Sequence, residues 1–157
     1  MMKILSRMMM SALVFFTVMG ISGMSVASEA EGRLVSVSAH GSFNQTVSMF
    51  KKLVAKNGMM ILGMINQGKV MGMTGLKLRS ETFFVGNPTM GKKLFSAQKG
   101  VGVLIPVRVN IYVNNDGKTI VSYLQPSKEL GAFHDPMLVQ MGMMLDKNLA
   151  MMTGMLK

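Results

Sequence analysis

The most regular pattern in this chain is an alternation of branched apolar residues between positions 101 and 113, where every second residue is valine or isoleucine. A period of two places such side chains on one face of a β-sheet. It predicts one long strand, bulged or at an edge near Pro106, because proline cannot donate a hydrogen bond to the ladder. The turn-forming residues 114–117 and the run 118–124 predict a returning strand, and therefore a hairpin. Shorter strands are predicted at 33–39, 59–65 and 82–85, and the strand at 59–65 is expected to be buried.

Helical periodicity occupies three other segments. A helix is predicted over 42–57, because Ser42 and Gln45 have the spacing of a capping box. A short helix is predicted from Pro88 to about residue 98, and a longer one over 137–156. The apolar stripe predicted for this last helix consists of Met137, Met141, Met144, Leu145, Leu149, Met151, Met152, Met155 and Leu156. The glycine-rich residues 66–75 show neither period and are predicted to be irregular.

These elements predict one α+β domain over residues 29–157. The expected architecture is a two-layer sandwich, in which a mainly antiparallel or mixed sheet is covered by helices and the chain ends in an amphipathic, methionine-rich helix. The 129 residues are long enough for a single core, and no internal repeat or linker divides them.

Residues 1–28 have the pattern of a cleavable signal peptide. Lys3 and Arg7 precede an apolar run that is short for a membrane span, and the small residues 26–28 suit a cut before Glu29. An uncleaved N-terminal anchor is the alternative. The chain contains no cysteine, which excludes a lipid-anchored cysteine and disulfides. We therefore expect a periplasmic or secreted protein with no stable membrane span after cleavage.

The chain is basic, with a formal net charge of +10. Fifteen of the seventeen Lys and Arg residues and all seven acids follow residue 28, so the predicted mature part carries +8. This charge favours anionic partners or surfaces. The basic residues are scattered without a block of five, which argues against a nucleic-acid partner.

Several short motifs resemble those of the domain-of-unknown-function family 302. They are Gly-Leu-Lys-Leu-Arg at 75–79, Phe-Phe-Val-Gly-Asn-Pro at 83–88, Asp-Gly at 116–117 and Val-Ser-Tyr at 121–123. The resemblance spans about residues 34–133 and implies a compact domain with helices packed against a sheet, with no established reaction. Where family members often carry Asp-His and Asp-Pro, this chain has Asn66-Gln67 and Gln125-Pro126. A site that depends on those side chains is therefore in doubt here.

Catalytic chemistry has little support in the sequence. His40 and His134 are the two histidines, and they are 94 positions apart, so no local motif unites them. No Gly-x-Ser-x-Gly or Ser-x-x-Lys motif accompanies a suitable base. An enzyme would need a cleft that brings His40 or His134 to an acid, and a non-enzymatic protein is the favoured interpretation.

A small anion is one candidate ligand. Gly86, Asn87 and Pro88 lie between a strand and a helix start, where free backbone N–H groups can meet an anion, and Lys92 and Lys93 follow one turn later. The alternative, which we favour, is structural: Gly86 provides a special backbone angle, Asn87 caps the helix and Pro88 begins it.

Methionine is unusually frequent, with 21 in the chain and 14 after residue 28. The sequence predicts no organic cofactor. Thioether sulfur is a ligand for Cu(I), and by analogy for Ag(I), so these methionines are candidate metal ligands. Met71 and Met73 in the glycine-rich segment are the best candidate ligands. Further candidates on the last helix are Met141, Met143 and Met144. The alternative is that these methionines fill the core or form an adaptable binding surface.

The sequence thus favours an exported, non-enzymatic binding or interaction protein. Its expected partner is an envelope protein or a second copy of the chain, contacted through the C-terminal helix. Periplasmic Cu(I) or Ag(I) binding and an enzyme with an unidentified site are the alternatives.

Overall fold

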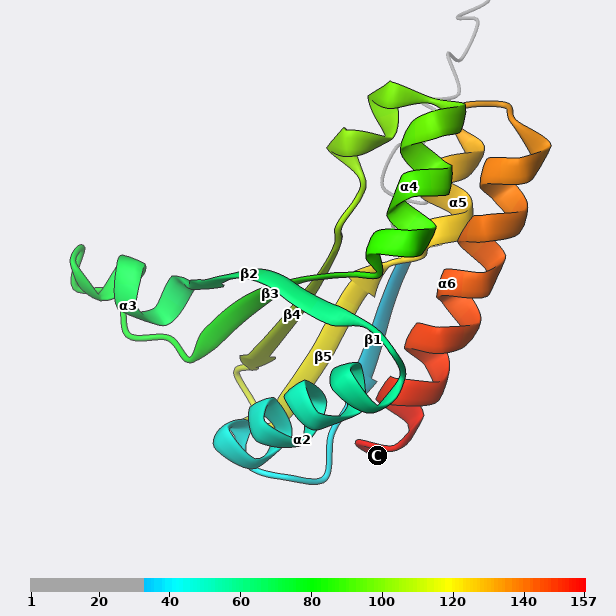
Figure 1. Ribbon diagram of the computed structural model, residues 1–157. Helices are drawn as coiled ribbons and strands as arrows, with labels where there is room; N and C mark the ends of the chain where they lie inside the picture. Colours follow the sequence, from blue (N-terminus) through cyan, green and yellow to red (C-terminus); the bar gives the residue numbers. More distant parts are fainter. Residues whose placement is uncertain (1–32) are drawn as a thin grey trace, which may run out of the picture.

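The computed structural model describes residues 33–157 (Figure 1). The predicted signal peptide lies outside these residues. None of the helices between Arg33 and Lys157 combines the length and the apolar character that crossing a membrane requires.

One antiparallel sheet of five strands, in the order β1-β5-β4-β3-β2, forms the centre of the described domain. The strands are β1 (Leu34–Ser38), β2 (Met60–Asn66), β3 (Ser80–Gly86), β4 (Val107–Val113) and β5 (Thr119–Leu124). The predicted hairpin is confirmed, because β4 pairs with β5 in a register that joins Val113 to Thr119. The α+β class and the single layer of sheet with covering helices are also confirmed.

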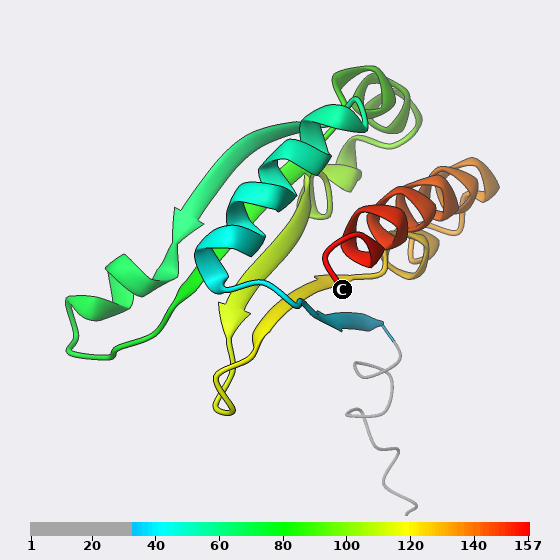
Figure 2. The same cartoon turned by 90° about the horizontal axis from the view of Figure 1, so that it is seen from below.

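Three main helices cover one face of this sheet (Figures 1 and 2). They are α2 (Phe43–Lys56), α4 (Pro88–Ala97) and α6 (Pro136–Gly154). Three short elements are α3 (Gln67–Gly72), the 3-10 helix η1 (Lys99–Val103) and α5 (Pro126–Gly131). Figure 1 shows α3 projecting away from the other helices, whereas α5 packs against α6.

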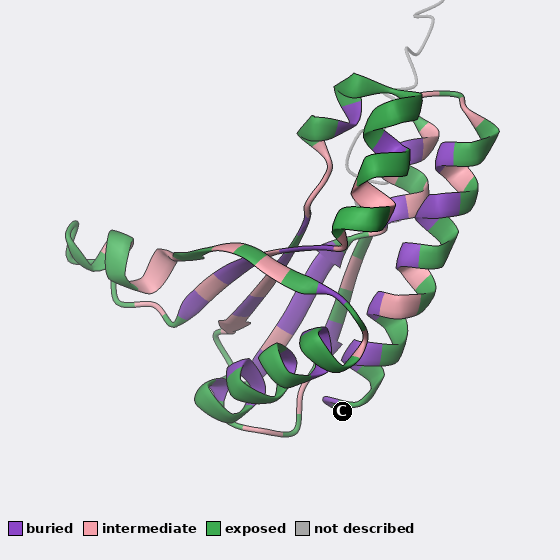
Figure 3. Cartoon of the chain, viewed as in Figure 1, coloured by how far each residue is buried: buried purple, intermediate pink, exposed green. Residues whose placement is uncertain are grey.

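The core lies between the sheet and these helices. Alternate strand residues such as Phe83, Val109 and Val121 point toward it, and Phe50 of α2 and Leu149 of α6 meet them from the other side. Figure 3 shows the resulting pattern, in which the helices are buried along the side that faces the sheet and exposed along the other. Burial of branched and aromatic side chains on one sheet face is what a period of two predicts.

The long strand predicted over 101–113 is wrong in its first half. Only Val107–Val113 is a strand, and Lys99–Val103 forms η1, with Val101 buried and Val103 76% exposed. The apolar alternation therefore continues across two different structures. Pro106 separates them, because it lacks the N–H group that a ladder needs.

Two further expectations for the β2 region also require correction. Strand β2 is an edge strand with exposed apolar side chains, not a buried strand, and Met60 and Leu62 are both about half exposed. Residues 66–75 are not wholly irregular, because Asn66 caps the short helix α3 by accepting a hydrogen bond from the Lys69 N–H at 2.7 Å. A side-chain cap explains why six residues can form a helix without a buried stripe.

Helix α6 is confirmed, but its buried stripe is rotated from the predicted one. Leu138, Met141, Leu145, Leu149 and Met152 are buried. The predicted stripe members Met137, Met144, Met151 and Met155 are exposed instead.

The rotation of α6 follows from its contact with α5. Gly142 lies so close to α5 that a Cβ atom built on it would be 2.6 Å from the Cα atom of Ser127. Glycine therefore permits a backbone approach that fixes which side of α6 faces inward.

Candidate functional site

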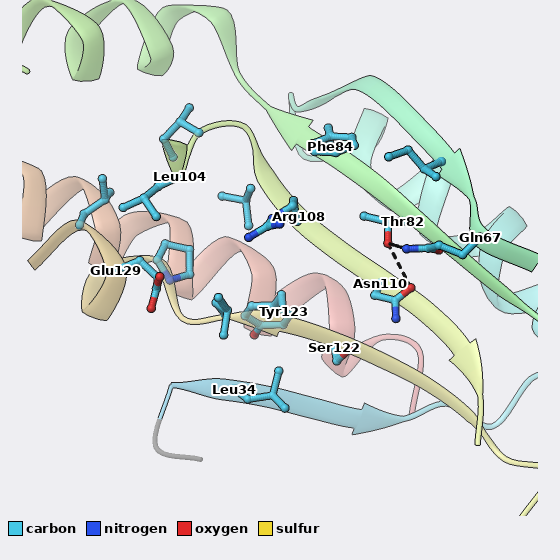
Figure 4. Close-up of a pocket in the computed structure, with 16 residues that line it drawn as sticks. Leu34, Gln67, Thr82, Phe84, Leu104, Arg108, Asn110, Ser122, Tyr123 and Glu129 are labelled. Carbon is cyan, nitrogen blue, oxygen red and sulfur yellow. Dashed lines mark hydrogen bonds between the residues drawn. The ribbon is translucent and has the colours of Figure 1, made fainter. Parts of the chain in front are cut away.

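The sheet face opposite α2, α4 and α6 contains a cavity of about 340 Å³ (Figure 4). Its floor consists of residues on β3, β4 and β5 that alternate with the core residues. Leu104 and Ile105 and the helix α5 form walls at one end, and Ile65 and Gln67 lie at the other. Pockets of this size hold small molecules in other proteins.

The strand registers arrange the floor in two rows across the sheet. One row contains Leu34, Leu124, Arg108 and Phe84. Leu34 pairs with Leu124 and Phe84 with Arg108, and Leu124 and Arg108 are the next residues beyond the Tyr123–Val109 pair. The adjacent row contains Ser122, Asn110 and Thr82. The two rows are about 7 Å apart, which is the advance of two residues along a strand. A polar row thus lies beside an apolar row with a single arginine in it.

The polar row is held in place by hydrogen bonds between side chains. The amide nitrogen of Gln67 donates to the hydroxyl of Thr82, which itself donates to Oδ1 of Asn110 at 3.2 Å (Figure 4). The hydroxyl of Ser80 lies 2.9 Å from Asn110 Oδ1 and 3.1 Å from Gln67 Oε1, and its single proton can be donated to either. Because the oxygen of Asn110 faces the hydroxyls of Thr82 and Ser80, its Nδ2 group remains to donate into the cavity. The network therefore fixes the direction of the Asn110 amide.

Two ionisable side chains of opposite charge line the cavity. Glu129 lies 3.4 Å from Nη1 of Arg33, and its side chain is only 15% exposed. Arg108 is exposed and forms no ion pair with an acid among residues 33–157. The carboxylate is therefore compensated by Arg33, and the guanidinium is left without a counter-charge in the described part of the chain.

The apolar part of the lining is partly exposed to solvent. Leu34 and Leu124, which face each other on β1 and β5, are 52% and 38% exposed. Phe84 lies on the far side of Arg108 and is half-buried. Contiguous apolar surface beside fixed polar groups marks interaction sites on soluble proteins.

Helix α5, one wall of the cavity, is attached to α6 by a carboxylate. Asp146 of α6 accepts hydrogen bonds from the backbone N–H of Ser127 at 3.1 Å and from Nε2 of Gln125 at 3.0 Å.

The side chain of Tyr123 is buried beside α6, and this burial raises the pKa of its phenol. The charge of Asp146 raises the pKa further, while a hydrogen bond with Thr153 lowers it in part. The phenol is therefore neutral at physiological pH.

At the start of α4, the residues considered as an anion site form a helix cap, which is the structural role that we favoured for them. Oδ1 of Asn87 accepts from the Met90 N–H at 3.0 Å, its Nδ2 donates to the Gly58 carbonyl at 2.8 Å, and Pro88 occupies the first turn. The expected special backbone angle at Gly86 is wrong, since its φ is not positive. Gly86 is instead needed for space, because a Cβ atom would lie 3.0 Å from Leu62 Cδ1.

Lys92 and Lys93 follow on α4, and both are exposed. They do not line the cavity on the open sheet face. Anion binding at the start of α4 stays a prediction.

The two histidines lie apart from the cavity. His40 lines a groove between α2 and the C-terminal residues, and no Asp or Glu is among the residues of 33–157 that line it. His134 lies between α5 and α6, and the neighbouring Asp135 caps α6 by accepting from the Met137 N–H at 2.8 Å. The structure therefore does not bring either histidine into the cleft with an acid that the enzyme hypothesis requires.

The methionines proposed as thioether ligands do not converge. Met71 lies in α3 and Met73 is its C-cap with helical angles, so the two side chains leave the helix in different directions. Met141 is buried in the core, whereas Met143 and Met144 are exposed. Among residues 33–157, no group of three or more histidine or acidic side chains could hold a metal. Cu(I) binding stays a prediction.

The sequence interpretation missed the cavity residues Arg108, Asn110, Thr82, Ser122 and Glu129. For Arg108 and Asn110 the signal was present as polar residues at alternate positions of β4, whereas Thr82, Ser122 and Glu129 lie on three other elements, β3, β5 and α5. That pattern is equally typical of a solvated face of a sheet. What distinguishes this face is the convergence of Gln67 and α5 on it, which only the tertiary structure shows.

Comparison with known proteins is consistent with this architecture. No curated protein matches the chain. A crystal structure of an uncharacterized conserved protein DUF302 from Bacillus stearothermophilus matches with a TM-score of 0.74 and 20% sequence identity, over 79% of this chain and 98% of that one. The family model described as Domain of unknown function DUF302 matches residues 35–157, and thus includes α6, which lies beyond the resemblance seen in the sequence. The chain therefore belongs to the DUF302 family.

Proposed function

We propose that this domain is a non-catalytic binding protein that holds a small amphipathic molecule on the open face of its sheet. The observation that carries the proposal is the cavity of about 340 Å³, in which a fixed polar row lies beside exposed apolar side chains. Such a combination of apolar lining and a few oriented polar groups is typical of small-ligand sites. Together with the predicted signal peptide, it supports a binding role in the cell envelope or outside the cell.

The lining residues favour binding over catalysis. Within the described residues 33–157, the lining includes no histidine, and Glu129 is its sole acid. Glu129 is engaged with Arg33 and its Oε1 atom is buried, so it is poorly placed to accept a proton from a bound molecule. The polar row consists of hydroxyl and amide groups, which orient a ligand without transferring protons at neutral pH.

The test is binding of Nile red, a neutral amphipathic dye, followed by its fluorescence on the purified protein. We expect saturable binding that Leu124→Trp weakens by about tenfold or more, because an indole at this position fills the cavity mouth. Ser96→Trp on the exposed surface of α4 is the matched control, and it should leave the affinity unchanged. Thermal melting of both variants checks that they are folded.

Two results would overturn the proposal. Equal dye affinity in the wild type and in folded Leu124→Trp would show that the cavity does not bind the dye. The other is a dimer, measured by analytical ultracentrifugation, that Leu124→Trp dissociates. It would show that a second copy of the chain covers this face.

A further inference from the structure

We infer that the molecule bound in this cavity is a monoanionic amphiphile, a carboxylate with an apolar chain, and that Arg108 binds its headgroup. The inference rests on the proposed function, since it names the chemical class of ligand for the same cavity. Its evidence is separate, because it comes from the donors and charges that the protein leaves unused.

The polar row and Arg108 offer hydrogen-bond donors to the cavity. The acceptor left without a hydrogen bond among the described lining residues is Oε1 of Glu129, whose charge is met by Arg33 at 3.4 Å. Oδ1 of Asn110 accepts from Thr82 and lies 2.9 Å from the Ser80 hydroxyl, so the amide offers Nδ2 to a ligand. The guanidinium of Arg108 has donors and no acceptor. The hydroxyl of Ser122 lies across from Asn110 on β5 and can complete the set. A ligand that satisfies these groups must bring acceptors, as a carboxylate does.

The charge of the lining favours one negative charge on the ligand. Arg108 is the sole cation among the lining residues, and it has no acidic partner within residues 33–157. Glu129 does not compensate it as an ion pair, because Glu129 is paired with Arg33. A monoanion neutralises Arg108, whereas a dianion would bring a second charge for which the lining has no cation.

The arrangement of the rows allows headgroup and chain to bind together. Arg108 lies in the apolar row between Leu124 and Phe84, near the middle of the cavity (Figure 4). In Figure 4 its guanidinium extends toward the α5 end, and rotation of this long, exposed side chain can bring it over the neighbouring polar row, about 7 Å away along the strands. A headgroup on Arg108 therefore leaves the apolar part of the ligand against Leu34 and Leu124, or against Leu104 at the α5 end.

The experiment compares decanoate with decanol, which share a chain length and differ in charge, by isothermal titration calorimetry below the concentration at which either aggregates. We expect the wild-type protein to bind decanoate at least about tenfold more tightly than decanol, because only decanoate pairs with Arg108. Arg108→Gln should remove this preference, because losing the positive charge weakens decanoate binding far more than decanol binding. Lys93→Gln, which removes a cation outside the cavity, is the matched control and should change neither affinity.

A second variant tests the polar row without removing its hydrogen bonds. Asn110→Asp keeps an oxygen for Ser80 and Thr82 but replaces the free Nδ2 donor with a second carboxylate oxygen. We expect it to weaken decanoate binding several-fold and to weaken decanol binding less, because two carboxylates repel each other whereas the alcohol is neutral.

The outcomes separate this inference from the proposed function. Equal binding of decanoate and decanol by the wild type would overturn the anionic headgroup while the cavity remained a binding site. Binding of neither ligand, together with no binding of Nile red, would overturn both. A preference for decanoate that persists in Arg108→Gln would overturn the role of Arg108. Tighter binding of decyl phosphate at a pH where it is a dianion would overturn the assignment to a monoanion.

Discussion

Replacing Gly142 by alanine should destabilise the domain, although the same change usually stabilises a helix. Gly142 lies in the middle of α6 and is buried against α5. A Cβ atom there would lie 2.6 Å from Ser127 Cα, 2.9 Å from Ser127 N and 3.0 Å from the Pro126 carbonyl oxygen. These are backbone atoms, which cannot rotate away, so α5 and α6 would have to separate.

The magnitude follows from two opposing contributions. Alanine gains about 0.5–1 kcal/mol over glycine in a helix interior. Overpacking a well-packed contact costs about 1–3 kcal/mol, and backbone contacts place Gly142 toward the upper part of that range. We therefore expect a net loss of about 1–2 kcal/mol in the free energy of unfolding. For a domain of this size the melting temperature should fall by roughly 3–10 °C.

Thermal unfolding followed by circular dichroism measures this change. Gly91→Ala on α4 is the matched control, because a Cβ atom at Gly91 meets no other atom within 4 Å. It should raise the melting temperature by roughly 2–5 °C, as expected for glycine to alanine in an open helix position. A Gly142→Ala protein as stable as Gly91→Ala would refute the close approach of α5 to α6.

Three further predictions test other parts of the structure. Asn87→Ala should cost about 1–2 kcal/mol in urea unfolding, because it removes the α4 cap and a bond to a neighbouring loop; a loss below a few tenths would contradict this role. Burial raises the pKa of Tyr123 above its ordinary value of 10.0, so the unfolded chain ionises first and stability should fall as the pH rises above about 10. Above about pH 10, the stability of Tyr123→Phe should fall less than that of Tyr112→Phe. Urea midpoints that decrease equally with pH in the two variants would contradict the raised pKa of Tyr123. The copper hypothesis predicts that the double variant Met71→Leu, Met73→Leu binds Cu(I) more weakly than wild type in an anaerobic competition titration while remaining folded, and unchanged affinity would exclude these ligands.

Local signals in the sequence predicted the elements that depend on neighbouring residues. The helix after Ser42 is present, and Gln45 accepts hydrogen bonds from the N–H and the hydroxyl of Ser42 at 2.9 and 2.8 Å. The β4–β5 hairpin is also present, with Gly117 at φ +77° in the turn. In both cases the determining contacts lie within a few residues, where sequence spacing is a direct guide.

Tertiary contacts decided the features that the sequence did not predict. Alternation through Val101 and Val103 looks the same in a strand as in a 3-10 helix whose neighbours bury one valine and expose the other. The rotation of α6 depends on the space that Gly142 leaves for α5, and no periodicity records that space. A hydrophobic pattern shows which residues can be buried, but the partner element determines which of them are.

The candidate site was hidden for a related reason. Arg108, Asn110 and Ser122 look like the solvated residues of an amphipathic sheet when read along the chain. They become a site because the strand registers align them, Gln67 and Thr82 fix the Asn110 amide, and α5 closes one end. Apart from the register of the β4–β5 hairpin, these contacts join segments far apart in the sequence.

The most direct test of the central claim is a titration of the isotope-labelled protein with decanoate, followed by the chemical shifts of its backbone amides. We predict that the largest changes map to the open face of the sheet, at Arg108, Asn110, Ser122 and Leu124, and saturate together. Changes confined instead to the groove that His40 and Met155 line between α2 and the C-terminal residues would contradict the claim.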